Sequence, residues 1–505
     1  MKLRRSLSVT FGVQAYSTIV TVALTPVLLT MLGPEGFGLI GFFLTVQTFL
    51  QIFDAGVSGT LARQIAIAKG CKKAFKSFIS DFYRIYMGFL CVGAILGGIG
   101  LLLSRHSSAW FETTIPLDIL SFSIKAMLIT LVVKYLCGPL KSVLIGLEVH
   151  GAIATANFVA ANLRYPGGLL VLYIFDNSLI YYFAFQVLVA LLEWLLYCIL
   201  FVYHKNVTIK RTIVTNNVSS LGIKVLLVSA LQLTLLSVLW VLVSQVDKLL
   251  LSGNVSLEEF GYYSLAVSVA GVILTLNLPI SQVLMPRLTS LASSNENTGY
   301  VRVLVRFILL SFTLFIPLCL MFFLYGQELI WSWTGNIEAA NKAGFYLKWL
   351  AIGNLFAILA NYSFLVQFSI KKLRRHLIAY SIYSSLLLPS IFIVVSNFKS
   401  EGTAIFWVVQ NGLFLFFWGL YSFRLLLPNL INTIVTPMFL ASLFLAGIAV
   451  FFASPLVGLF GDGRPGTFFS LVLVGGLAVA VLIILNFLLK ARLELAMRKI
   501  ELVIR

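Results

Sequence analysis

Charged residues are scarce in this sequence. They make up 11% of the 505 residues, whereas hydrophobic residues make up 60%, and a soluble globular chain carries about 25% charged residues. No polar interval is longer than roughly twenty residues, far below the ~100 residues of a typical domain. The shortage of charge excludes a water-soluble protein, and the short polar intervals exclude a large soluble domain. The main solvent of this chain must be lipid.

Motifs of soluble enzymes and metal proteins are missing as well. The five cysteines occur singly, which predicts neither a disulfide framework nor a cysteine metal site. The four histidines lack the spacing of metal ligands, and the sequence has no Walker A motif to bind ATP. A membrane glycosyltransferase or polymerase is the competing enzyme class, but it would need a large outer loop with catalytic side chains. We therefore predict that the chain is not an enzyme and binds no cofactor or metal.

What the sequence has in abundance is long apolar runs. Because a helix crosses the hydrocarbon core with about 20 apolar residues, these runs predict an all-α integral membrane protein with about fourteen transmembrane helices. The predicted spans are residues 9–32, 38–60, 82–103, 118–140, 152–174, 180–203, 224–251, 260–285, 305–326, 343–367, 378–396, 403–425, 433–453 and 467–489.

The net charge of +18 comes from basic residues that concentrate in alternate predicted loops. This distribution is typical of membrane proteins, whose cytoplasmic loops hold an excess of Lys and Arg. Binding of nucleic acid is therefore not predicted. The first apolar run lacks a signal-peptide cleavage site, so we interpret it as an uncleaved first span. We predict a multi-pass protein with both termini in the cytoplasm.

A short sequence pattern occurs twice. Residues 33–39 read Gly-Pro-Glu-Gly-Phe-Gly-Leu, and residues 256–262 read Ser-Leu-Glu-Glu-Phe-Gly-Tyr. Both contain x-x-Glu-x-Phe-Gly at a constant offset (256 − 33 = 223), and both begin the second predicted helix of a half. The alternative is two ordinary helix starts, each with an acid near the positive end of the helix dipole. A true duplication predicts parallel repeats with the substrate between them.

The repeat divides the chain into three predicted parts. Residues 1–212 form an N-terminal six-helix lobe, residues 213–427 form a C-terminal six-helix lobe, and residues 428–505 add two transmembrane helices and a cytoplasmic tail. An even number of spans separates the two copies, so the lobes share one orientation in the membrane. Rocking of such lobes gives alternating access to a site between them.

These motifs resemble those of a known family. The sequence is similar to the polysaccharide flippases (O-antigen, Wzx type) of the multidrug/oligosaccharidyl-lipid/polysaccharide (MOP) exporter superfamily. The matching stretches are Leu-Gly-Pro-Glu-Gly-Phe-Gly-Leu-Ile-Gly-Phe-Phe-Leu at 32–44, Phe-Asp-Ala-Gly at 53–56, Asp-Lys-Leu-Leu-Leu-Ser at 247–252, Leu-Glu-Glu-Phe-Gly-Tyr-Tyr-Ser-Leu-Ala at 257–266 and Pro-Arg-Leu at 286–288. The resemblance implies a V-shaped bundle of two six-helix repeats with two further helices at the C-terminus.

The resemblance also implies a transport function. In such proteins a central cavity takes an undecaprenyl-pyrophosphate-linked oligosaccharide from the cytoplasmic leaflet of the bacterial inner membrane and releases it outside. The implied partners are this lipid-linked oligosaccharide and membrane lipids. A polysaccharide polymerase, a chain-length regulator and coupling to H⁺ or Na⁺ are left open. Two alternatives remain within the superfamily, a drug/cation antiporter with fewer spans and a less charged cavity, and a lipid II flippase with a similar number of spans.

Ionisable residues inside the predicted spans are the candidate functional residues. A charge at the bilayer centre costs at least ~2.5–3.5 kcal/mol, so each one needs a partner or a wet cavity. A non-transporting scaffold would not need them. The candidates for substrate binding are Arg164, Lys125 and Lys248, and the candidates for ion coupling or charge pairing are Asp54, Glu193 and Asp247.

Arg164 and Glu193 are expected to face each other. They lie on consecutive predicted helices joined by a short outer turn, at depths that differ by about 4.5 Å at 1.5 Å per residue. One interpretation is a buried pair that only fixes helix packing. The other is that Arg164 faces the cavity and binds pyrophosphate or an acidic sugar, because a guanidinium offers two parallel hydrogen bonds to such an anion.

The remaining candidates lie on helices that no short turn joins. Asp247 and Lys248 are adjacent, and neighbouring side chains do not face each other on a helix, so we predict that they do not pair. Lys125 is expected to meet Asp247 at a similar depth, or to extend with Lys248 to the outer interface. Asp54 has no partner in the sequence. It is either structural or a candidate for H⁺ or Na⁺ coupling, because a desolvated carboxylate can titrate near neutral pH.

Two clusters of basic residues lie in predicted cytoplasmic loops, at 69–76 and 371–375. Such clusters determine topology and contact anionic lipid headgroups. The alternative interpretation is that they gather lipid-pyrophosphate molecules at the mouth of the cavity.

Overall fold

The computed structural model describes residues 2–54, 57–69, 71–211, 223–294, 296–461, 463–497 and 500, and every regular element in these ranges is a helix. This confirms the all-α prediction. The first half contains α1 (Lys2–Asp54), α2 (Val57–Ala68), α3 (Lys72–Leu103), the 3-10 helix η1 (Ser104–His106), α4 (Ser107–Trp110), α5 (Leu117–Gly146), α6 (His150–Asn162), the π-helix η2 (Leu163–Gly167), α7 (Gly168–Ile174), α8 (Leu179–Arg211) and α9 (Ile223–Ser252).

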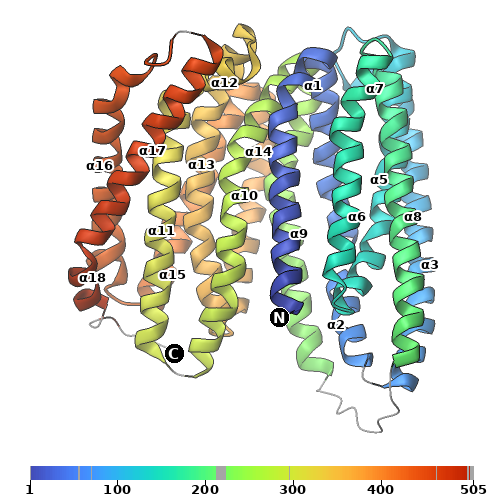
Figure 1. The fold of residues 1–505 in the computed structure, drawn as a ribbon, viewed down its shortest axis with the longest axis horizontal. Coiled ribbons are helices and arrows are strands. Elements are labelled where there is room, and N and C mark those ends of the chain that lie inside the picture. The colour runs from blue at the N-terminus through green and yellow to red at the C-terminus, as the bar shows by residue number, and fades with distance from the viewer. Residues whose placement is uncertain are drawn as a thin grey trace. The chain divides into compact units, whose positions relative to one another are not determined.

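The second half is also helical in its described residues (Figure 1). It contains α10 (Leu257–Ser293), α11 (Asn297–Leu324), α12 (Gly326–Thr334), α13 (Ile337–Ser369), α14 (Leu373–Leu413), the π-helix η3 (Phe414–Gly419), α15 (Leu420–Leu426), the π-helix η4 (Ile431–Val435), α16 (Thr436–Ala453), the 3-10 helix η5 (Ser454–Leu456), α17 (Arg464–Leu488) and α18 (Lys490–Met497).

The chain packs as two compact units, Met1–Gly261 and Tyr262–Arg505. In the first unit α5 and α8 pack against each other, α6 packs on α8, and α9 packs on α1. In the second unit α13 packs against α14 and α11, and α16 packs against α17. The predicted boundary between the lobes, at 212/213, lies outside the described residues, and the three predicted parts stay a prediction.

Eleven helices in the described residues are long and apolar enough to cross a membrane. Two of them contain a sharp break, at Gly33 in α1 and at Lys399 in α14. A further predicted span is divided into α6, η2 and α7, none of which is long enough alone. These three interruptions explain why eleven continuous helices correspond to a larger number of predicted crossings. The number fourteen itself stays a prediction.

The break in α1 follows from its local sequence. Gly33 has φ 71° and ψ 172°, a conformation that is accessible to glycine because it has no Cβ. Pro34 follows directly and cannot donate a backbone hydrogen bond. The helix therefore ends and restarts at this dipeptide, and Glu35 lies in the first turn of the new segment.

Both copies of the repeated motif are bound by one loop, between α4 and α5. The carboxylate of Glu35 accepts hydrogen bonds from the Thr113 hydroxyl (2.5 Å) and from the Thr114 backbone N–H (3.1 Å). In the second copy, the backbone N–H of Leu257 donates to the Glu112 carbonyl at 2.8 Å. The motif glutamate of the first copy therefore anchors a loop as well as lying at a helix start.

The two motif copies also contact each other through their glycines. A Cβ atom on Gly38 would overlap the carbonyl oxygen of Leu257, and a Cβ on Gly261 would overlap that of Pro34. Each such Cβ would lie 3.3 Å from the backbone nitrogen of the other glycine. The contact is reciprocal, because Leu257 and Gly261 follow Pro34 and Gly38 by the same 223 positions (257 − 34 and 261 − 38). The motif glycines thus allow two helix starts to pack backbone to backbone.

Candidate substrate-binding site

Arg164 lies on a π-helix between α6 and α7. This segment, η2, contains Pro166, which lacks an N–H and so disturbs the helical hydrogen bonding. The side chain of Gln186 donates to the Arg164 carbonyl at 3.2 Å and so satisfies a backbone group that lies away from water. Single π-helical turns occur frequently at functional sites. The local sequence therefore fixes a distorted turn that places Arg164 against α8.

Arg164 and Glu193 form the expected ion pair. The distance between Nη2 of Arg164 and Oε2 of Glu193 is 2.6 Å, with side chains 23% and 15% exposed. Figure 1 shows α6 and α8, whose packing brings the two residues together, running alongside each other. The prediction of the contact is confirmed. The partial exposure of both side chains leaves the guanidinium accessible from one side.

Lys134, on α5, completes a cluster that the sequence interpretation missed. It is not among the predicted candidates, yet it lies seventeen residues into α5 (134 − 117). Its Nζ donates to Oε1 of Gln47 at 2.8 Å and lies 5.3 Å above the ring centre of Phe43. It is within electrostatic range of both Arg164 and Glu193. Its position inside the predicted span 118–140 was the signal that could have identified it.

The cluster of Lys134, Arg164 and Glu193 has a net positive charge, with two cations and one carboxylate. A guanidinium has five N–H donors. Among the described contacts of the Arg164 side chain, one donor is engaged, in the hydrogen bond to Glu193. The remaining donors suit a phosphate or carboxylate, which Arg binds in a bidentate manner. The arrangement can therefore hold an anion within the helical part of the first unit.

Replacing Lys134 tests whether this cluster acts on an anionic cargo. We expect Lys134→Gln to lower transport about tenfold, the equivalent of ~1.4 kcal/mol for one charge-assisted contact, whereas Lys134→Arg keeps most of it. The measurement is transport by the purified protein in liposomes. Lys205→Gln is the matched control, because Lys205 also lies over an aromatic ring, that of Tyr83, but its hydrogen bond to the Tyr83 hydroxyl is exposed to solvent. Equal transport by Lys134→Gln and Lys205→Gln would contradict the assignment.

Asp247 and Lys248 pair with each other, so the prediction that they do not was wrong. Nζ of Lys248 lies 3.2 Å from Oδ1 of Asp247 and also donates to the Ser244 carbonyl. The prediction considered only the directions in which neighbouring side chains leave a helix. The four-carbon stem of Lys248 is flexible, so its ammonium folds back and reaches the adjacent carboxylate. Asp247 is 3% exposed, which makes this a buried pair on α9.

The expected contact between Lys125 and Asp247 is not formed. Lys125 is exposed on α5, and Asp247 forms its ion pair with Lys248. Lys125 therefore does not join the Lys134 cluster through any described contact. Asp54 is the last residue of α1. Its side chain lies outside the described part of the structure, so its role stays a prediction.

Parts of the two basic clusters have identifiable surroundings. Lys69 forms an ion pair with Glu148 at 2.8 Å. The hydrogen bond and the positive charge of Lys69 hold the pKa of the Glu148 carboxyl below its usual range. Nζ of Lys372 is covered from solvent and has no hydrogen-bond partner among the described atoms. In the described residues no group of three His, Cys, Asp or Glu could hold a metal ion.

The sequence matches a protein family over more than half of its length. The family described as polysaccharide biosynthesis protein matches residues 3–292. No curated protein matches the chain. The matched segment contains every residue of the Lys134 cluster and both motif copies.

Solved structures with a similar fold are membrane transporters. The lipid II flippase MurJ, in an inward closed conformation, aligns with a TM-score of 0.67 and 14% identity over 96% of this chain and 99% of MurJ. An inward-facing MATE family multidrug resistance transporter of the MOP superfamily aligns with a TM-score of 0.62 and 12% identity, over 80% of this chain and 93% of the transporter. A MOP superfamily transporter from Pyrococcus furiosus aligns with a TM-score of 0.54 and 14% identity, over 83% and 93%.

The family match and the similar folds agree with each other. Identities of this size show the fold alone, and the family match is independent of them. Together they confirm the resemblance and the prediction of a multi-pass membrane transporter rather than an enzyme. The chain belongs to the polysaccharide biosynthesis protein family and has the fold of the MOP superfamily of transporters.

Proposed function

We propose that this protein is a flippase that moves a polyprenyl-pyrophosphate-linked oligosaccharide, such as an O-antigen repeat unit, from the cytoplasmic to the outer leaflet of the bacterial inner membrane. The observation that carries the proposal is the half-buried cluster of Lys134, Arg164 and Glu193, with its net positive charge. A charge at this depth is costly and marks a substrate or ion pathway in membrane proteins. A pyrophosphate headgroup matches the positive charge of the cluster, and a pyrophosphate-linked sugar is a cargo in keeping with the polysaccharide biosynthesis family.

Two alternatives from the same superfamily differ in cargo. A drug/cation antiporter has to bind cations, and two cations beside one carboxylate repel them. A lipid II flippase carries a cargo of the same anionic lipid class, so the cluster does not separate it from the proposal. The family match to polysaccharide biosynthesis supports an oligosaccharide other than the lipid II sugar.

Transport against a gradient needs a source of energy, and we propose coupling to H⁺ or Na⁺. Asp247 and Glu193 are buried or half-buried carboxylates, each with one basic partner. A carboxylate in such a place can exchange its basic partner for a proton or Na⁺ when the cavity changes its access. A polysaccharide polymerase and a chain-length regulator, which use the flipped product, are proposed partners of the pathway.

Deletion of the gene in its native bacterium tests the cargo. We expect lipid-linked repeat units to accumulate on the cytoplasmic side and surface polysaccharide to be lost, while drug susceptibility stays unchanged. Leaflet position is measured by the access of an impermeant sugar-oxidising reagent to spheroplasts. A copy of the wild-type gene should restore the surface polymer. Increased drug susceptibility with normal surface polysaccharide would favour the antiporter, and loss of cell-wall synthesis would favour the lipid II flippase.

A further inference from the structure

A groove of about 1250 Å³ lies in the second unit, and no residue of the Lys134 cluster lines it. Its walls are the two arms of one helical hairpin. Lys399, with φ 48°, breaks α14, and the Tyr383 hydroxyl donates across to the Gln410 carbonyl at 2.8 Å, so the arms run antiparallel. The groove is lined by Arg375, Ile378, Ala379, Ile382, Tyr383, Leu386, Leu387, Ser390, Phe406, Leu413, Phe414, Phe417, Trp418, Tyr421, Arg424, Leu425, Leu426 and Pro428.

The aromatic walls of the groove are held by hydrogen bonds to buried partners. The indole N–H of Trp418 donates to Nδ1 of His376 at 3.0 Å, and His376 is 3% exposed. The ring of Tyr383 packs on Phe414, with ring centres 4.8 Å apart. Because the polar atoms of Trp418 and Tyr383 are satisfied by the protein, their rings contribute apolar surface to the groove. The surface is thus preorganised for a hydrocarbon ligand, which lowers the entropic cost of binding.

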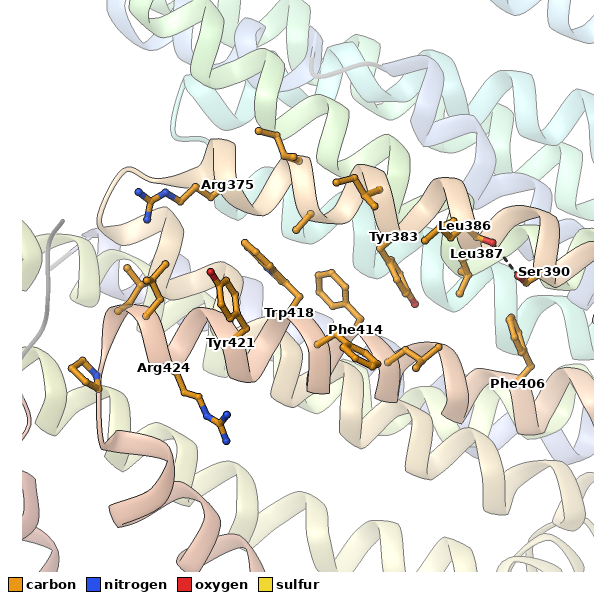
Figure 2. A pocket seen from close by; sticks show the side chains of 18 residues that line it. Arg375, Tyr383, Leu386, Leu387, Ser390, Phe406, Phe414, Trp418, Tyr421 and Arg424 are labelled. Carbon is orange, nitrogen blue, oxygen red and sulfur yellow. Dashed lines mark hydrogen bonds between the residues drawn. The ribbon is translucent and has the colours of Figure 1, made fainter.

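Positive charge is confined to one end of this apolar surface. Figure 2 shows Arg375 and Arg424 at the same end, with Ser390 and Phe406 at the other. Both arginines are exposed, and neither forms an ion pair with a described side chain. The lining contains no acidic residue. A ligand that fits this pattern has an anionic head and a long apolar tail.

The nearby Lys372 adds to this positive charge. It lies three residues before Arg375, and its covered ammonium has no partner among the described atoms. Desolvation, together with repulsion by Arg375, lowers the pKa of Lys372. An anion bound at this end would offset that repulsion. The basic segment 371–375, which the sequence placed in a predicted cytoplasmic loop, therefore ends at the mouth of the groove.

The length of the groove distinguishes between lipid tails. Arg375 and Ser390 are fifteen residues apart on α14 (390 − 375), which is about 22 Å at 1.5 Å per residue. One leaflet is about 15 Å deep, half of the ~30 Å hydrocarbon core. A phospholipid tail of one leaflet would fill only part of the groove. An isoprenoid chain long enough to pass the bilayer midplane would fill it.

We propose that this groove binds a polyprenyl phosphate or pyrophosphate, with the isoprenoid chain against the aromatic wall and the phosphate held by Arg375 and Arg424. The importance of this site for transport rests on the proposed flippase function, because the groove would then be a second binding site for the lipid carrier of the cargo. The binding itself does not depend on that function. Guanidinium groups suit the phosphate because they form bidentate hydrogen bonds with it.

Binding of undecaprenyl phosphate to the full-length protein in phosphatidylcholine nanodiscs tests the site, with native mass spectrometry as the readout. We expect the double variant Arg375→Gln/Arg424→Gln to weaken binding at least about tenfold, because it removes one or two charge-assisted contacts to the phosphate. The separate variant Leu386→Trp should weaken binding to a similar extent, because the larger side chain fills the groove where the tail would lie. Leu386 is 70% exposed, so its replacement leaves the core intact.

Matched controls come from the same helix. Arg374→Gln removes an exposed charge beside the groove, and Phe392→Trp enlarges a 59% exposed side chain outside the lining. Both controls should bind like the wild type. Wild-type binding by both groove variants would overturn the proposal. Displacement of undecaprenyl phosphate by an equal concentration of phosphatidylglycerol or of inorganic phosphate would overturn it too, because the site would then be a general lipid or anion site.

The two proposals fail in different ways. If the groove variants lose lipid binding but the wild-type protein flips no lipid-linked oligosaccharide in liposomes, the groove stands and the flippase function fails. If the wild type flips this cargo while the groove variants bind and transport normally, the flippase function stands and the groove proposal fails.

Discussion

The double variant Arg164→Gln/Glu193→Gln is expected to accumulate to nearly wild-type levels in the membrane and yet to lose at least about tenfold of its transport. The expected loss follows from the value of a charged hydrogen bond, ~1.5–3 kcal/mol, because the guanidinium would contact the pyrophosphate directly. Two neutral amides can still hydrogen-bond across the site of the 2.6 Å ion pair. Flipping of a lipid-linked oligosaccharide in liposomes, normalised to folded protein, is the measurement.

The single variants separate binding from packing. Arg164→Gln alone leaves the Glu193 carboxylate half-buried without its partner, which typically costs 3–5 kcal/mol, so we expect less folded protein. Glu193→Gln alone should keep protein levels normal, because the amide oxygen still accepts a hydrogen bond from Arg164, whose side chain is 23% exposed. Arg164→Lys keeps the charge but loses the planar fork, and it should impair transport at normal protein levels. If the double variant transports normally, or if Arg164→Lys and Glu193→Gln lose folded protein equally, the pair only fixes helix packing.

Gly261→Ala is expected to destabilise the protein strongly, although the same change usually stabilises a helix. Alanine in place of glycine within a helix gains about 0.5–1 kcal/mol. At Gly261 the added methyl group would overlap the Pro34 carbonyl, a backbone atom that cannot move as a flexible side chain can. Overpacking of this kind costs about 1–3 kcal/mol or more. Thermal unfolding in detergent, followed by size-exclusion fluorescence, is the measurement.

Gly271→Ala is the matched control on the same helix, α10. A Cβ at Gly271 would meet nothing within 4 Å, so this variant should be as stable as the wild type or slightly more so. Because the contact is reciprocal, Gly38→Ala should behave like Gly261→Ala. Equal stability of the Gly261 and Gly271 variants would show that the two motif copies do not pack as described.

The membrane-embedded helices were predictable because the signal for them is local. Each apolar run of about 20 residues has to form a helix, since no water in the bilayer core can satisfy its backbone. The break at Gly33 was marked in the same way by a Gly-Pro dipeptide. The break at Lys399 falls in the predicted gap between the spans 378–396 and 403–425, although nothing in its own sequence requires the positive φ of this residue.

The contacts between helices were predicted less completely. The Arg164–Glu193 pair was predicted because a short turn joins their two helices. The number of residues between each side chain and this turn gives its depth in the membrane, and the two depths are similar. The Asp247–Lys248 pair was missed because a long side chain can fold back along its own helix. Lys134 was missed because its partners Gln47 and Phe43 lie on a helix that is far away in sequence.

The sequence by itself determined that this protein lies in lipid, that it is helical and that it contains a repeated motif with a Glu and a Gly. Only the tertiary structure decided which faces of the helices meet. In water an amphipathic pattern reveals the buried face, but in lipid both faces are apolar, as on α5, which buries Leu131 and exposes Ile129. The rotation of each helix about its axis is therefore set by packing. That packing placed Lys134 within electrostatic range of Arg164, and it brought the two motif glycines into contact.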